Sequence, residues 1–209
     1  MDKTEIFNFF KKRKNEKQIS PFTFTEYLDY TSHMAREIYL TSITPQNAET
    51  IVKTIKMWNE IDDESGVELM SRPPIKMYIN STGGNFEAML TLMDIIKMSK
   101  TPVHTINMGI VQNEAFFVYI AGHTRYTYQK ATFLYKQDLK SLAETDPSMN
   151  NYVLLYEKQL SELKDILMER TKVTETEYNK HSKNNWWLNS EEAQRLRISN
   201  EVLFTLYSR

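Results

Sequence analysis

Apolar residues along this chain follow two patterns, which together predict strands that alternate with helices. Short apolar runs typical of strands occur at 36–40, 75–79, 103–107 and 125–134. The segments between them place apolar residues three and four positions apart, which is the spacing of one face of a helix. Strands that alternate with helices favour a parallel sheet with right-handed crossovers, so the pattern predicts the α/β fold class.

The first helix has the clearest start. Thr44 suits the N-cap position and Pro45 suits the first helical position. Apolar residues at helical spacing form its predicted buried stripe: Ala48, Ile51, Val52, Ile55 and Trp58. We expect the segment 61–74 to be an acidic loop, because it contains three consecutive acidic residues and ends at two prolines.

Glycines follow the second and third predicted strands. Gly83 and Gly84 precede a helix whose buried residues are predicted to be Phe86, Met89, Leu90 and Met93. Gly109 is predicted to form a turn before another helix, whose apolar residues include Phe116, Phe117 and Tyr119. A strand that ends in Gly-Gly before a helix presents backbone N–H groups, which suit an anion or a developing oxyanion.

The longest helical signal covers 151–172. Four large apolar residues recur four, three and four positions apart and form a seam: Tyr156, Leu160, Leu163 and Leu167. This seam either packs on its own domain or interdigitates with a partner subunit, and the spacing favours neither. Further along, Thr174 and Glu177 can form a capping box, and Ser190 opens a last helix.

Length and composition narrow the class of protein. The 209 residues suffice for one sizeable core, so we expect an N-terminal arm at 1–30 and a single domain at 31–209. A net charge of −1 gives no electrostatic reason to bind nucleic acid, and no apolar run approaches the length of a membrane span. The absence of cysteine excludes disulfides and thiol nucleophiles and fits a cytoplasmic location.

The motifs offer little intact chemistry. Serine hydrolysis needs a nucleophile at a helix start, but the turn after the third strand reads Asn113-Glu114. The four histidines lack the spacing of metal ligands, and no glycine-rich phosphate loop is present. We therefore predict neither a metal nor a cofactor.

Several motifs in fixed order resemble one family. They are YINSTGG at 78–84, TPVHTI at 101–106, Gly109 with Ala121-Gly122 further on, and NSEEA at 189–193. This set resembles the proteolytic subunit of the ATP-dependent Clp protease (ClpP) over roughly residues 36–203. The resemblance implies a ClpP/crotonase-like fold of repeated β-β-α units with a protruding handle helix at about 151–172.

The resemblance also implies where the catalytic Ser-His-Asp triad of the family would stand. Counting from the flanking motifs places the serine at Asn113, the histidine at Lys136 and the aspartate at Asn185. The family's oxyanion-hole donors fall on Gly84 and Glu114, and its glycine-rich substrate strand falls on 139–145, which contains no glycine. A Glu114 carboxylate that pointed into an oxyanion hole would oppose negative charge there.

All three triad positions are substituted, so we expect a catalytically inactive ClpP-like protein with a role in assembly, scaffolding or regulation. The family implies heptameric rings, possibly stacked, formed by this chain alone or with an active paralogue, and an AAA+ ATPase as a possible partner. The seam at Tyr156, Leu160, Leu163 and Leu167 would then serve oligomerisation. The alternative is an enzyme with a rebuilt site, either a hydrolase around Lys136 with Ser81, Ser99 or Ser141, or an acyl-binding enzyme around Glu114.

Overall fold

The computed structural model describes residues 24–136, 150–181 and 184–205. By internal contacts the chain divides into two units, Met1–Ala35 and Arg36–Arg209. In the first unit the described element is helix α2, Phe24–Met34. The boundary of the predicted arm at residue 30 stays a prediction. The segment 139–145, where the family's substrate strand would fall, lies outside the described residues, as does Ser141.

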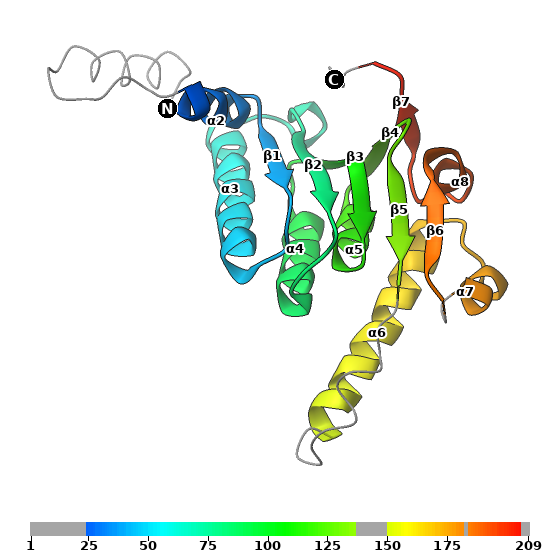
Figure 1. The fold of residues 1–209 in the computed structure, drawn as a ribbon. Coiled ribbons are helices and arrows are strands. Elements are labelled where there is room, and N and C mark those ends of the chain that lie inside the picture. The colour runs from blue at the N-terminus through cyan, green and yellow to red at the C-terminus, as the bar shows by residue number, and fades with distance from the viewer. Residues whose placement is uncertain (1–23, 137–149, 182–183, 206–209) are drawn as a thin grey trace, which may run out of the picture. The chain divides into compact units, whose positions relative to one another are not determined.

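The second unit contains the alternating elements that the hydropathy pattern predicts (Figure 1). Its strands are β1 (Glu37–Leu40), β2 (Ile75–Ser81), β3 (Val103–Gln112), β4 (Thr124–Tyr128), β5 (Thr132–Tyr135), β6 (Trp186–Asn189) and β7 (Glu201–Leu203). Its helices are α3 (Pro45–Glu64), the 3₁₀ turn η1 (Leu69–Ser71), α4 (Phe86–Met98), α5 (Glu114–Ala121), α6 (Asn150–Arg170), α7 (Glu175–His181) and α8 (Ser190–Arg195).

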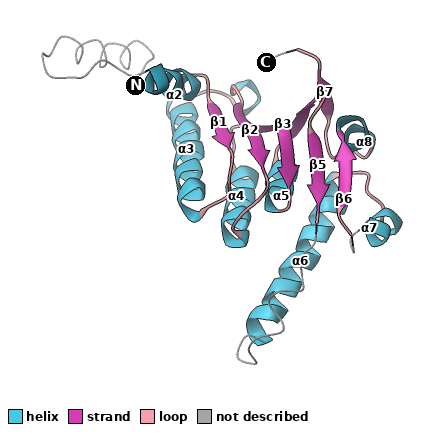
Figure 2. Cartoon of the chain, viewed as in Figure 1, coloured by secondary structure: helices cyan, strands magenta, loops and turns pink. Residues whose placement is uncertain are grey.

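One sheet connects these strands (Figure 2). Strands β1, β2, β3, β4 and β7 are neighbours in that order, and each pair is parallel. The ten-residue strand β3 pairs with β4 along its first half and with β5 along its second half, and β6 runs antiparallel to β5. The prediction of an α/β fold with a parallel sheet is therefore confirmed.

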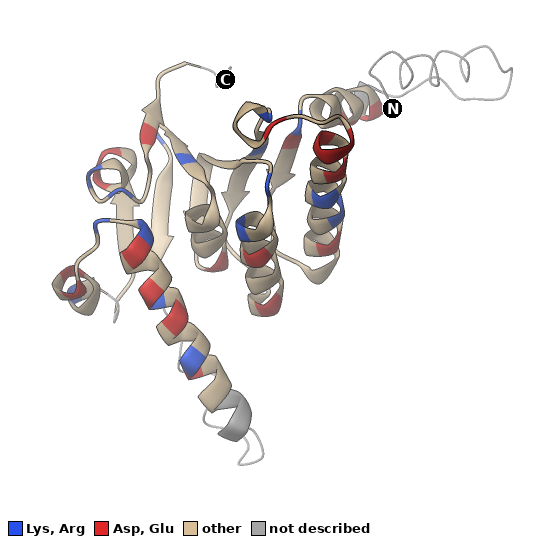
Figure 3. Ribbon diagram, turned by 180° about the vertical axis from the view of Figure 1, so that it is seen from behind, with Lys and Arg blue, Asp and Glu red and all other residues tan. Residues whose placement is uncertain are grey.

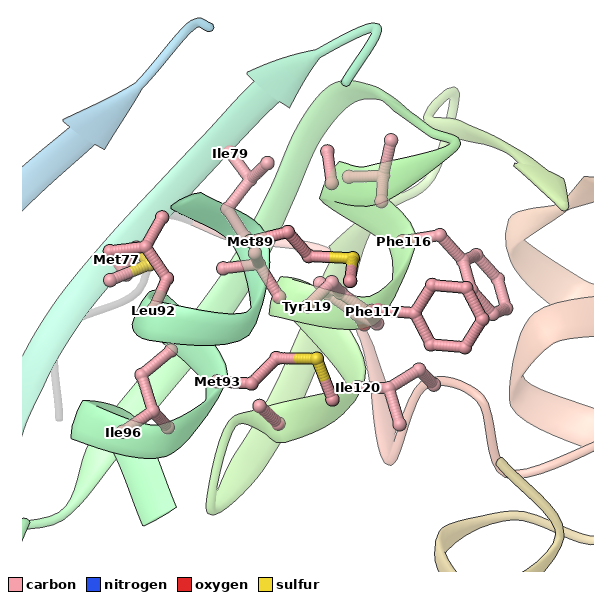
Figure 4. Packing of buried hydrophobic residues seen from close by; sticks show 14 of the residues in the cluster. Met77, Ile79, Met89, Leu92, Met93, Ile96, Phe116, Phe117, Tyr119 and Ile120 are labelled. Carbon is pink, nitrogen blue, oxygen red and sulfur yellow. The ribbon is translucent and has the colours of Figure 1, made fainter. Parts of the chain in front are cut away.

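Helices α3, α4 and α5 lie along one face of the sheet (Figure 1). Their apolar faces meet the sheet in one core, in which Leu92, Ile96 and Tyr119 are among the fully buried side chains. Figure 4 shows Met89 and Met93 of α4 beside Phe116 and Ile120 of α5. Every residue of α5 after Glu114, from Ala115 to Ala121, is buried, so the core holds this helix in place.

Side-chain caps fix the helix starts. The Thr44 side chain accepts a hydrogen bond from the backbone N–H of Asn47, and Pro45 is the first residue of α3, as predicted. Asn85 caps α4 in the same way, and Asn189 forms a capping box with Glu192 at α8. The predicted capping box between Thr174 and Glu177 is also present at α7.

Three predictions about element boundaries are wrong. Helix α3 continues to Glu64, so the first residues of the predicted 61–74 loop are helical. Gly109 lies inside β3 instead of forming a turn. A Cβ atom at Gly109 would lie 2.6 Å from the Asn80 side-chain oxygen, so this glycine permits close approach between two strands. The predicted strand 125–134 is two strands, β4 and β5, separated by a turn.

A buried arginine joins the last elements of the chain to the sheet. Arg125 is 4% exposed, and its guanidinium donates hydrogen bonds to the carbonyls of Arg170, Arg197 and Ile198. The first two carbonyls lie at or just beyond the C-terminal ends of α6 and α8, where the helix dipole favours a positive charge. Burial lowers the pKa of Arg125 from its ordinary value.

The opposite face of the sheet carries a second, smaller apolar cluster. It consists of Tyr78, Ile106 and Tyr126, with Met108, Tyr128 and Leu203 packed beside it. Tyr39, which is 51% exposed, stacks on Tyr78 with ring centroids 5.2 Å apart. The three cluster residues are themselves buried, so Tyr39 is the exposed edge of this cluster.

His104 lies on this second face and gives the stability a pH dependence. Burial, with smaller contributions from His123 and Lys76, lowers the pKa of His104 from its ordinary 6.5 to about 4. As the pH falls, the unfolded chain therefore binds a proton at His104 before the folded chain does. The stability that depends on a neutral His104 is complete above pH 6.5 and is lost as the pH falls towards 4. We expect the urea midpoint to fall across that window and His104→Gln to flatten the fall. If the urea midpoint fell equally steeply with pH in the wild type and in His104→Gln, the pH dependence would not come from His104.

The apolar seam of α6 is divided between its own domain and solvent. Leu163 and Leu167 are 2% and 0% exposed, so they pack inside this chain, and their assignment to a subunit interface is corrected. Leu160 and Tyr156 are partly buried, and the Tyr156 ring lies 4.5 Å from that of Phe86. Among the residues of the helix from 154 onward, Leu154 and Leu155 are exposed apolar side chains. Charged side chains are spaced along the rest of α6 (Figure 3).

Candidate functional site

The site is built around the junction between β3 and α5. Asn113 occupies this junction with φ 50° and ψ −120°, a backbone conformation that is strained for a residue other than glycine. Its backbone N–H donates to the Leu134 carbonyl at 3.1 Å, and its side-chain Nδ2 donates to the Thr82 carbonyl at 2.8 Å. The surrounding chain thus holds a strained strand-to-helix turn of the kind that presents a nucleophile in hydrolases.

The Gly83-Gly84 turn lies against this junction. Both glycines have positive φ, 110° and 153°. The turn is fixed by a hydrogen bond from Ile43 N–H to the Gly83 carbonyl, and a Cβ atom on Gly84 would lie 2.1 Å from the Ile43 oxygen. The Ser81 hydroxyl is hydrogen-bonded within the same turn, where its Oγ accepts from Gly83 N–H at 3.2 Å. Only glycine fits at Gly84.

Glu114 fills the place that the glycine turn leaves open. One carboxylate oxygen, Oε2, accepts a hydrogen bond from the Gly84 backbone N–H at 2.9 Å. The same oxygen would lie 2.2 Å from a Cβ atom on Gly83, so the carboxylate packs directly on the turn. The backbone donor assigned to an oxyanion is therefore occupied by an anion that belongs to the chain itself. The sequence identified both residues, but it could not give the direction of the Glu114 side chain.

Lys136 and Asn185 lie beside each other at the end of the β5–β6 pair. The last antiparallel partners in this pair are Tyr135 and Trp186, and continuation of the register by one residue places Lys136 opposite Asn185. Both side chains are exposed. Because β5 also pairs with β3 up to Gln112, directly before Asn113, the fold brings all three positions to one end of the sheet.

A cavity of about 110 Å³ adjoins this junction. Asn113, Glu114 and Lys136 line it, whereas Asn185 does not. The same cavity is also lined by Phe86 of α4 and by Tyr156 and Leu160 of α6, and the sequence did not predict this. Their helical spacing identified them as packing residues, and only the three-dimensional arrangement shows that they also form a wall of the site.

The described residues contain no group of three or more His, Asp or Glu side chains that could hold a metal ion. None of the helices in this described part of the chain is both long and apolar enough to cross a membrane.

The fold and the site together define an α/β protein in which asparagine occupies a strained strand-to-helix turn beside a Gly-Gly turn. Comparison with solved structures supports the fold: ClpP1 from Listeria monocytogenes superimposes with a TM-score of 0.68 at 23% identity, over 85% of this chain and 96% of that chain. A mutant of the same protein gives a TM-score of 0.69 at 22% identity, over 86% of this chain and 97% of that chain.

Sequence comparison gives the family. The Clp protease family matches residues 26–205, and the chain therefore belongs to the Clp protease family. The ATP-dependent Clp protease proteolytic subunit 2 of Treponema pallidum is 28% identical over 57% of this chain and 61% of its own length. The protein of that name from Treponema denticola is 28% identical over 60% of this chain and 64% of its own length, so both matches span less than two thirds of the relative. That of Pseudomonas aeruginosa is 24% identical over 80% of this chain and 81% of its own.

Proposed function

We propose that this chain is a catalytically inactive, Clp-protease-like subunit that contributes to assembly or regulation. The observation that carries this proposal is the hydrogen bond between Gly84 N–H and the Glu114 carboxylate. An oxyanion would need this donor, and a carboxylate beside it would repel the developing negative charge. Asn113 at the strained turn has no hydroxyl or thiol to form an acyl-enzyme.

The alternative of a rebuilt enzyme has weaker support. A lysine acts as a base when it is desolvated, but Lys136 is exposed to solvent. Glu114 would need a free carboxylate to act as an acid or base, but its Oε2 is bound to the glycine turn. The Ser81 hydroxyl accepts from Gly83 N–H within its own turn, and the Ser99 hydroxyl donates to the Thr101 carbonyl. Neither of these hydrogen bonds places a hydroxyl beside Lys136.

The proposed assembly is a ring of the Clp protease type, formed with copies of this chain or with an active paralogue, and able to meet an AAA+ ATPase. Exposed apolar side chains among the described residues support such contacts. They are Leu154 and Leu155 on α6, and Tyr39 at the edge of the buried cluster around Tyr78. Exposed apolar surface of this kind is typical of sites for protein partners. A cytoplasmic location fits this role.

The purified protein should be inert towards a fluorogenic peptide and towards a fluorophosphonate that labels reactive serines. An active Clp protease proteolytic subunit serves as the positive control. Light scattering of the same sample at micromolar concentration should show a species much larger than one chain of 24.7 kDa.

Two results would contradict this proposal. Labelling of a serine that is lost in Lys136→Ala would show a rebuilt hydrolase, and a clean monomer would remove the assembly role. The double variant Leu154→Asp with Leu155→Asp should break the assembly, because both side chains are exposed on the single chain. Glu157→Gln, an exposed change three residues from Leu154, is the matched control and should leave the particle size unchanged.

A further inference from the structure

The backbone of Asn113 brings its own side chain beside the next peptide nitrogen. Its φ of 50° and ψ of −120° are close to those of the first central residue of a type II′ turn. The substituents of a tetrahedral carbon are about 120° apart when viewed along one of its bonds. A ψ near −120° in an L-residue therefore eclipses Cβ with the nitrogen of the following residue, here Glu114.

Contacts with the glycine turn agree with this arrangement. A Cβ atom on Gly83 would lie 3.1 Å from Asn113 Cβ and 3.2 Å from Glu114 N, so both atoms face the same point of the turn. The Asn113 Nδ2 donates to the Thr82 carbonyl, which is bonded to the Gly83 nitrogen. The Asn113 Cγ is bonded to both Cβ and Nδ2, and it is therefore held on the side where Glu114 N lies.

The Glu114 nitrogen can act as a nucleophile. Its N–H is the first of helix α5, and a helix contains no acceptor for an N–H at this position. The side chain of the N-cap residue, Asn113, forms no capping hydrogen bond either. The partial positive charge at the start of a helix also stabilises a nitrogen that has lost its proton.

We propose that Asn113 is a site of spontaneous deamidation, in which the Glu114 backbone nitrogen attacks the Asn113 side chain. The nitrogen gives its proton to hydroxide and bonds to Cγ, the Cγ–Nδ2 bond breaks, and Nδ2 takes a proton from water and leaves as ammonia. Water then opens the resulting succinimide ring and leaves aspartate or isoaspartate at position 113. Asn113 lines the cavity of about 110 Å³, which is large enough to hold this water. The modification does not depend on the proposed function.

Deamidation changes the contacts of the glycine turn. A carboxylate at position 113 cannot donate to the Thr82 carbonyl, and it adds a negative charge next to the Glu114 carboxylate. The repulsion acts on the Glu114 carboxylate that binds Gly84 N–H. Asn113→Asp, which has the same side chain as one product, should therefore melt about 4 °C below the wild type. An equal melting temperature would overturn this effect on the turn.

The same dipeptide occurs elsewhere in the chain in other conformations. Asn59-Glu60 lies inside α3, where the Glu60 N–H position is one that donates within the helix. Asn200-Glu201 enters β7, and the Asn200 Oδ1 accepts from Arg125 N–H. Of these three asparagines, Asn113 alone has positive φ. A further copy, Asn15-Glu16, lies outside the described residues. Because the neighbouring residue is identical, a difference in rate reports the conformation.

The test is incubation of the full chain in mildly alkaline buffer made with water enriched in a heavy oxygen isotope, followed by peptide mapping with mass spectrometry. Asn113 should lose ammonia and gain the isotope at least about tenfold faster than Asn59 or Asn200, because its geometry is aligned for attack. In urea, which removes this alignment, Asn113 should react at least about tenfold more slowly than in the folded chain.

The variant Asn113→Gly assigns the reactive residue. It removes the side-chain amide, and glycine adopts positive φ without strain, so the turn is kept. The peptide that contains position 113 should then gain no isotope, which excludes the neighbouring Gln112 as the source. Equal rates at the three asparagines, a faster reaction in urea, cleavage of the chain after Asn113, or isotope that persists in Asn113→Gly would each overturn the proposal.

Discussion

Replacement of Asp62 by alanine is expected to lower the free energy of unfolding by about 3–5 kcal/mol, because it leaves a partly buried arginine without its counter-charge. Asp62 is 1% exposed at the end of α3 and forms two hydrogen bonds with Arg36, at 2.5 and 2.8 Å. It also accepts from the Thr101 hydroxyl at 2.6 Å. The Arg36 guanidinium lies over the Trp58 ring at 4.6 Å, so the pair joins α3 to the start of β1 and to the residues before β3.

Urea denaturation followed by circular dichroism measures this effect. Burial opposes the charged form of Asp62, but hydrogen bonds from Arg36 and Thr101 outweigh it and hold the pKa of the carboxyl below its usual range. The pair therefore stabilises the fold at neutral pH and should be lost only in strong acid. Glu64→Ala, an exposed change two residues along the same helix end, is the control and should alter stability by less than about 0.5 kcal/mol. A comparable loss in both variants would contradict the role of the buried pair.

Asp62 also shows where the sequence stops being informative about the fold. Three consecutive acidic residues predict a solvated loop, because an isolated carboxylate is too costly to bury. The partner that makes burial possible is Arg36, 26 residues earlier, and no local pattern indicates this contact. The prediction of Gly109 as a turn failed for the same kind of reason. The close approach that requires this glycine is made by Asn80, from the neighbouring strand. The alternation of strands and helices was predictable because it is encoded in local spacing.

The candidate site was likewise predictable only where it depends on local spacing along the chain. The positions of Asn113, Glu114 and Lys136 could be counted from motifs, since those distances along the chain are fixed. Their meeting at one end of the sheet follows from the pairing of β5 with both β3 and β6. The direction of the Glu114 side chain could not be predicted, because it depends on a backbone donor 30 residues away. Burial of Leu163 and Leu167 by their own chain likewise depends on how α6 lies against α5.

Restoration of the triad alone is expected to leave the protein almost unreactive. The variant Asn113→Ser, Lys136→His and Asn185→Asp would supply the three groups that the family resemblance implies, at positions that the fold brings to one end of the sheet. The strained turn is already in place to present a hydroxyl. Glu114 would still occupy the Gly84 donor, however, and loss of one such donor slows acyl transfer by about 10²–10³-fold. The negative charge of the carboxylate would add electrostatic repulsion to this loss.

Addition of Glu114→Ala to the triad-restored variant should therefore raise the rate of fluorophosphonate labelling by about 10²–10³-fold, because it frees the Gly84 N–H and removes the repelling charge. Labelling kinetics followed by intact-protein mass spectrometry measure this ratio without requiring that a peptide substrate dock. A fourfold variant that carries Asn113→Ala in place of Asn113→Ser should not label, which assigns the reactive oxygen. If the triad-restored variant labels equally fast with and without Glu114, the carboxylate does not block the oxyanion site. Catalytic inactivity would then rest on the triad substitutions alone.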